Sequence, residues 1–200
     1  GVRLGMFTEA SHTLKDLLRC AEEAVAGLYE HYRDSIDQPP ATAAAHYTLA
    51  GFYTYHHRRP ELSERALEKA QTHLMLALRI QTRQLGHLHV STLCSQLVKA
   101  QVMLLQSNTA GCGRLLAKQL DCCERTLSSE HPLAAKMLAV LARLHLKQGR
   151  YEECERLQQR VLNMRRTALG SHHEDTHRSA MDVSSRRRQH IFHGHHSAQS

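Results

Sequence analysis

The strongest constraint on the fold is an internal repeat of 42 residues. Three histidines, His89, His131 and His173, close similar junctions, and each stands 42 residues after the one before it. The junctions read Leu85-Gly86-His87-Leu88-His89, Leu127-Ser128-Ser129-Glu130-His131 and Leu169-Gly170-Ser171-His172-His173. A period that holds over two intervals indicates one structural unit repeated along the chain.

Each unit has the pattern of two helices joined by a short turn. In the last complete unit, His131-Pro132 begins a first helix, because proline suits a first turn where no N–H donor is needed. Apolar residues then recur at a helical period, and Gly149 ends the helix with a residue suited to a left-handed C-cap. Tyr151 begins the second helix, which runs to Leu169. Stacked hairpins of this kind predict an all-α solenoid.

The repeat array is expected to cover residues 1–170 and to start within a unit. The first residues, Gly5-Met6-Phe7-Thr8-Glu9-Ala10, match the later turn Gly149-Arg150-Tyr151-Glu152-Glu153-Cys154. Residues 171–200 begin another first helix and then become rich in His, Arg and Ser. Because such a composition buries little apolar surface, we predict a degenerate repeat start followed by a disordered tail.

Composition narrows the function classes. The net charge is +7, but the basic residues are spread over the helices and form no stripe with aromatic residues, which disfavours nucleic acid as the partner. No apolar run approaches the roughly 20 residues of a membrane helix. The six cysteines form no CxxC pair, which predicts a reduced, cytoplasmic protein with buried thiols. Neither a metal nor a cofactor is expected.

The turn Gln148-Gly149-Arg150-Tyr151-Glu152-Glu153-Cys154-Glu155, followed by Leu169-Gly170 and His173, resembles the 42-residue tetratricopeptide units of kinesin light chains and nephrocystin-type proteins. The resemblance covers roughly residues 1–183. It implies a right-handed superhelical solenoid whose concave groove, lined by first helices, holds peptides of partner proteins. Proteins with such units often act as adaptors or scaffolds. Kinesin light chain units carry paired Asn residues before the Leu-Ala of the first helix, whereas the slots here read Tyr47-Thr48, Leu97-Val98 and Ala139-Val140.

A candidate peptide groove follows from the register of the first helices. If Ala142 packs between helices, Arg143 and Lys136 should face the groove, since they lie one position after it and six before it. The equivalent positions and their neighbours give the predicted set of Tyr47, Leu97, Gln101, Lys136, Arg143, Leu146 and Lys147. Such a weakly basic groove would suit an acidic peptide, because arginine binds carboxylates in bidentate fashion. The alternative is a solvated helix face.

Two other function classes stay open. His173-Glu174-Asp175-Thr176-His177 has the H-E-x-x-H form of zinc hydrolases, with two histidine ligands and Glu174 as the base. This string occupies the slot that reads His131-Pro132 one repeat earlier, and no third ligand is placed, so we expect it to be inert and the protein to be no enzyme. The other class is an RNA-binding helical repeat, whose affinity would fall steeply with salt. The sequence favours a protein-interaction scaffold.

Overall fold

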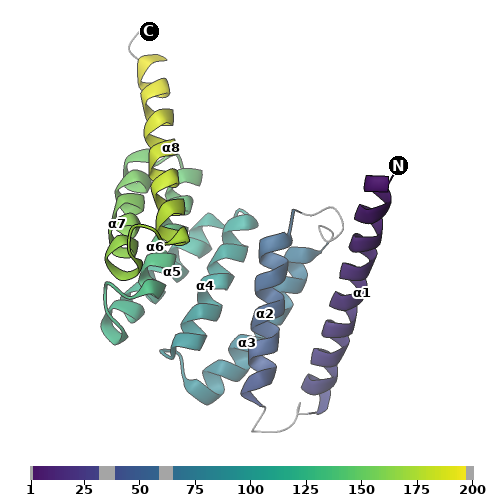
Figure 1. The fold of residues 1–200 in the computed structure, drawn as a ribbon. Helices are drawn as coiled ribbons and strands as arrows, with labels where there is room; N and C mark the ends of the chain where they lie inside the picture. Colours follow the sequence, from purple (N-terminus) through teal and green to yellow (C-terminus); the bar gives the residue numbers. More distant parts are fainter. Residues whose placement is uncertain (1, 32–38, 59–64, 197–200) are drawn as a thin grey trace. The chain divides into compact units, whose positions relative to one another are not determined.

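In the computed structural model, eight α-helices and no strands occupy the described residues, which are 2–31, 39–58 and 65–196 (Figure 1). The helices are α1 (Val2–His31), α2 (Pro40–His56), α3 (Ala66–Leu85), α4 (Val90–Leu105), α5 (Thr109–Thr126), α6 (Pro132–Lys147), α7 (Tyr151–Leu169) and α8 (Glu174–His196). The predicted all-α class is confirmed. The chain divides into two compact units, Gly1–Val102 and Met103–Ser200, which are described separately below.

The three repeat histidines have one structural role. His131 is the N-cap of α6, and its Nδ1 accepts a hydrogen bond of 3.1 Å from the backbone N–H two residues ahead. His89 before α4 and His173 before α8 accept the same bond, at 3.2 and 3.1 Å. The first turn of a helix leaves its N–H groups without intrahelical acceptors, and a capping side chain satisfies one of them. The 42-residue period therefore repeats a helix cap.

The turn between α6 and α7 follows the sequence prediction closely. Gly149 has a φ of 73°, in the left-handed region where glycine avoids the clash of a Cβ atom, and α7 begins two residues later at Tyr151. α6 packs against α7, and the small residues Ala142 and Cys154 are almost fully buried. Small side chains let the two helix backbones approach, which builds a tight hairpin.

In the N-terminal unit, α2 packs against α3 and α1 packs against α2. One core cluster joins Tyr53 of α2 and Leu74 of α3 with buried alanines of both helices. A second cluster joins Leu18 and Val25 of α1 to Leu49 of α2. Val98 and Val102 of α4 complete the first cluster, so the unit is a helical hairpin with α1 packed on its first helix and the larger part of α4 in its core.

In the C-terminal unit, α8 packs against α7 and is also held by hydrogen bonds. The Arg165 Nη1 on α7 donates to the carbonyl of Asp175 at 3.0 Å and to the hydroxyl of Ser179 at 2.7 Å. The Thr176 hydroxyl donates to the carbonyl of Arg165 at 3.3 Å. α8 thus occupies the place of a further first helix. Residues 197–200 of the predicted tail lie outside the described residues, and the division between residues 170 and 171 stays a prediction.

Candidate peptide-binding surface

Lys136 and Arg143 share the exposed face of α6. Both residues are exposed, and Ala139 between them is partly exposed. Seven residues make about two helical turns, so the two side chains leave the helix on the same side. The register argument therefore identified two cations that the structure brings onto one face.

Arg143 is an exposed residue, yet neighbouring groups alter its environment. Loss of solvation lowers the pKa of the guanidinium, while Asp182 on α8 and the Cys112 thiol on α5 act in the opposite direction. The guanidinium stays charged at neutral pH, because its ordinary pKa lies far above 7. Arg143 is therefore a permanent cation, and it interacts electrostatically with the Asp182 carboxylate on α8.

Lys136 borders a small depression, open to solvent, in the C-terminal unit. Its apolar lining is Pro132 and Ala135 of α6 with Met164, Ala168 and Leu169 of α7. Its charged lining is Lys136, Arg165, Glu130 and Asp175. The depression joins an apolar surface to the basic face of α6.

Lys147 has a partner inside the C-terminal unit. Its Nζ donates to the carbonyl oxygen of Leu104 at 2.8 Å and lies 3.5 Å from the Ser107 hydroxyl. Leu104 belongs to the last turn of α4, and its carbonyl oxygen also accepts the backbone N–H of Ser107 at 3.2 Å, so Lys147 is a second donor to a carbonyl at the helix end. Lys147 therefore has a structural role, and Leu146 beside it is partly exposed. Their part in a groove stays a prediction.

The other predicted groove residues belong to the N-terminal unit. Tyr47 of α2 is half-buried, and burial together with the nearby Cys94 raises the pKa of its hydroxyl. Gln101 is partly exposed, whereas Leu97 is only 6% exposed and offers little surface to a ligand. A single groove formed by all seven predicted residues stays a prediction.

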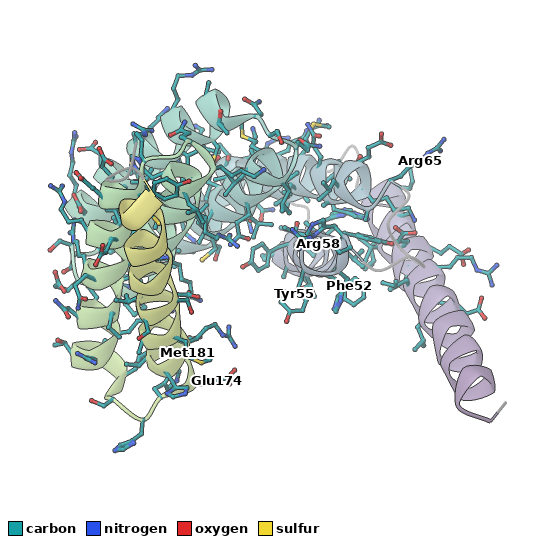
Figure 2. The ribbon with its side chains drawn as sticks, turned by 90° about the horizontal axis from the view of Figure 1, so that it is seen from above. Phe52, Tyr55, Arg58, Arg65, Glu174 and Met181 are labelled. Carbon is teal, nitrogen blue, oxygen red and sulfur yellow. The ribbon has the colours of Figure 1, made fainter. Side chains whose placement is uncertain are left out.

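Sequence reasoning missed two exposed positions on α8. Met181 is 60% exposed, and Figure 2 shows it on α8 together with Glu174. The repeat register contains the signal: Met181 stands 42 residues after Ala139, and Arg178 stands 42 residues after Lys136. Arg178 forms an ion pair of 2.6 Å with Glu174. The basic position of Lys136 on α6 therefore recurs as Arg178 on α8, and the apolar side chain of Met181 follows it by three residues.

Tyr55 is a third exposed position, on α2 of the N-terminal unit. Its side chain is 82% exposed, and Figure 2 shows it projecting from the helix near Phe52. The rings of Tyr55 and His56 meet edge to face, with their centres 4.8 Å apart. The ring centres of His56 and Phe52 are 4.5 Å apart. The ring is thus oriented by its neighbours, while its outer surface faces solvent.

A partly buried polar cluster joins α1, α2 and α3 of the N-terminal unit. The Glu22 carboxylate on α1 accepts hydrogen bonds from the Tyr53 hydroxyl at 2.7 Å and from Lys69 Nζ at 3.0 Å. The His73 Nε2 lies 3.7 Å from the same carboxylate, and its Nδ1 lies 3.0 Å from the Nδ1 of His46. Burial raises the pKa of Glu22, but the two hydrogen bonds and the nearby cations outweigh it and lower the pKa. This cluster fastens α1 to the hairpin.

The H-E-x-x-H string has a structural explanation. His173 caps α8, Glu174 pairs with Arg178, and His177 is exposed. Within the described ranges, no group of three or more His, Cys, Asp or Glu side chains is placed to hold a metal. Its inertness stays a prediction with a direct test.

Two further observations concern the whole chain. No disulfide joins the six cysteines, all of which lie in described helices. None of the helices, as far as the structure describes them, has the length and apolar character needed to cross a lipid bilayer.

The sequence and the fold were compared with those of known proteins. Residues 99–167 match the family model of the tetratricopeptide repeat, and no match was found among curated protein sequences. A Podosopora anserina structure, described as nearly identical TPR-like repeats and assigned as a kinesin light chain, has a TM-score of 0.60 at 23% identity, covering 74% of this chain and 66% of that one. BtubC (BKLC) from P. vanneervenii has a TM-score of 0.61 at 16% identity, covering 94% of this chain and 74% of its own.

These matches show tetratricopeptide repeats in part of the chain and a similar fold over most of it. The chain spans just under two thirds of the Podosopora anserina structure, and at these identities the likeness concerns the fold. Residues 99–167 match tetratricopeptide repeats, and the fold of the chain is similar to that of TPR-like repeat solenoids. Its repeats are of the kinesin light chain-like type in fold, as the turn at residues 148–155 predicted.

Proposed function

We propose that the protein is a scaffold whose C-terminal unit binds a peptide segment of a partner on the exposed face of α6 and α8. The tetratricopeptide fold supports an interaction scaffold in general. The observation that carries the specific proposal is the shared face of Lys136 and Arg143 on α6, together with Arg178, the repeat equivalent of Lys136, and Met181, that of Ala139, both exposed on α8. A cation at the same position of two successive repeats, with Arg143 beside the first, favours an acidic partner.

The spacing of the cations sets the spacing of the acidic residues that they would bind. Lys136 and Arg143 are seven residues apart, which is about 10 Å along a helix. A peptide in the polyproline II conformation has three residues per turn and rises about 3.1 Å per residue, so carboxylates three residues apart lie on one face and about 9 Å apart. Asp182 and Glu174 lie among the cations and would repel misplaced carboxylates, which adds selectivity for spacing.

The test is a fluorescence anisotropy titration of a labelled library of acidic peptides against the intact chain. Replacing Lys136→Glu and Arg143→Glu together should weaken the best peptide by about 1–3 kcal/mol, which is the scale of charge-assisted hydrogen bonds. The matched control replaces Lys118→Glu and Arg156→Glu, two exposed cations on α5 and α7, and makes the same change in net charge. Equal losses in both double variants would show only a general effect of charge and would refute the proposal.

The thermal melt, followed by circular dichroism, is the second control. All four residues are exposed, so both double variants should keep the wild-type melting temperature within the small range expected of surface substitutions. Affinity should also fall as salt rises, because ions screen exposed charges. An affinity that is indifferent to salt would contradict a basic binding face.

A further inference from the structure

The helix α1 has an apolar face that is exposed as well as one that is buried. Leu18 and Val25 lie in a core cluster with Leu49 of α2, and Ala21 packs against that cluster. Successive residues turn by about 100° around a helix, so the residues next to this buried face can be read from the sequence. They form an exposed set, called the outer apolar face below, which consists of Leu17, Cys20, Ala24, Gly27 and Leu28.

The outer apolar face has large side chains at its ends and small ones between them. Leu17 is 64% exposed and Leu28 is 45% exposed, and eleven residues make about three turns, so both leave the helix on the same side. At Gly27, no atom lies within 4 Å of the place where a Cβ atom would stand. Apolar surface that is continuous over three turns is typical of an interaction site, whereas single exposed leucines are common.

The charged residues of α1 lie beyond the outer apolar face and are paired within the helix. The Arg19 side chain lies 3.4 Å from the Asp16 carboxylate and 4.0 Å from that of Glu23. A partner that covers the outer apolar face therefore needs no countercharge, and it buries no charged residue of that face. This favours another apolar helix face over a charged peptide.

The order of side chains along this face is complementary to itself. Leu17 and Gly27 are each five residues from position 22, and Cys20 and Ala24 are each two residues from it. If two copies of α1 pair antiparallel about this position, Leu17 of one copy lies opposite Gly27 of the other, and Cys20 lies opposite Ala24. Each contact then occurs twice, as a twofold interface requires. A large side chain opposite a small one lets two helices pack closely.

The last described helix, α8, has no comparable face. Ala135 and Ala142 of α6 are almost fully buried, and the residues 42 positions later on α8 are His177 and Ser184, which are exposed. Polar side chains at these positions are typical of a capping helix that faces water. A second copy is therefore expected to meet α1 with its own α1, which gives a closed pair rather than a filament.

We propose that the outer apolar face of α1 binds the same face of a second copy of the chain, in an antiparallel dimer in which Leu17 of each copy packs into the space at Gly27 of the other. The contact uses α1 of the N-terminal unit and none of the residues of the proposed peptide-binding face. The two proposals can therefore fail independently.

The first test is sedimentation equilibrium of the intact chain from micromolar to submillimolar concentrations. The mean mass should rise toward that of two chains, and Leu17→Glu should weaken the dimer at least tenfold, because it buries a charge at the contact. The matched control is Leu88→Glu, at a leucine that is 52% exposed and lies before α4, and it should leave the dimer unchanged. A single-chain mass at every concentration, a mass beyond two chains, or equal losses in both variants overturns the proposal.

The second test separates a fitted contact from general apolar association. Gly27→Leu should weaken the dimer at least tenfold, although leucine is more apolar and favours the helix, because it fills the space that receives Leu17. Combining it with Leu17→Ala exchanges the large and the small side chain and should restore the dimer. Both positions are exposed, so the helical circular dichroism signal should persist in each variant. A stronger dimer in Gly27→Leu, or no recovery in the double variant, overturns the proposed pairing.

Discussion

The His46–His73 pair makes the N-terminal unit sensitive to acid. His46 is 2% exposed, its Nδ1 lies 3.0 Å from that of His73, and burial together with the charge of His73 lowers its pKa from 6.5 to about 4. The folded unit therefore takes up this proton less readily than the unfolded chain. Stability from His46 is fully present above pH 6.5 and falls as the pH is lowered toward 4.

The magnitude follows from the two pKa values. Each unit of difference corresponds to about 1.36 kcal/mol, and the pKa of His46 falls by about 2.5. Between pH 7.5 and pH 4, the free energy of unfolding should therefore drop by about 3 kcal/mol through this residue alone. Burial also lowers the pKa of His73, and the pKa of Glu22 is lowered too. Both groups therefore also reduce the free energy of unfolding as the pH falls.

The assay is urea unfolding followed by tyrosine fluorescence. The chain has no tryptophan, and five of its six tyrosines belong to the N-terminal unit, so the emission reports mainly on that unit. His46→Gln keeps a polar partner for His73 but has no proton to gain, so its loss of stability between pH 7.5 and pH 4 should be smaller by about 3 kcal/mol. The control is His87→Gln, an exposed histidine before α4. Equal losses in wild type and His46→Gln would refute the reasoning.

Three further predictions concern single contacts. His131→Ala should destabilise the protein by about 0.5–2 kcal/mol in a circular dichroism melt, while His131→Asn, which keeps a capping acceptor, should retain most of that stability. Lys147→Met should cost about 0.5–1.5 kcal/mol by the same measurement, because the Leu104 carbonyl loses a charged donor but keeps the Ser107 N–H; an unchanged melt would contradict a structural role for Lys147. Glu174→Gln should change stability by under roughly 0.5 kcal/mol, and the wild type should show no hydrolysis and retain no zinc after dialysis; stoichiometric zinc lost on His173→Ala would contradict this.

The parts of the fold that the sequence predicted are those with local signals. The helix start at Pro132, the turn at Gly149 and the start at Tyr151 each depend on a few adjacent residues, and the structure places them as predicted. The 42-residue period supplied the order of the helices, because equivalent positions in a solenoid have equivalent neighbours. Lys136 and Arg143 were placed on one face by the same argument.

The parts that the sequence did not predict depend on contacts between distant residues. Lys147 reaches a carbonyl 43 residues away, and nothing near it in the sequence marks that partner. The Glu22 cluster joins three helices without any period, so no pattern of spacing identifies it.

The histidine caps also fix the tautomer of three imidazole rings. A cap needs a lone pair on Nδ1, so the neutral ring at His89, His131 and His173 carries its hydrogen on Nε2. Nε2 is the nitrogen that a metal ion most readily reaches on an exposed ring. While Nε2 carries the hydrogen, it has no lone pair for a metal ion. A metal can take that nitrogen only if the hydrogen leaves it, and moving the hydrogen to Nδ1 breaks the cap. The repeat that brings histidines to every junction therefore also discourages them from acting as ligands.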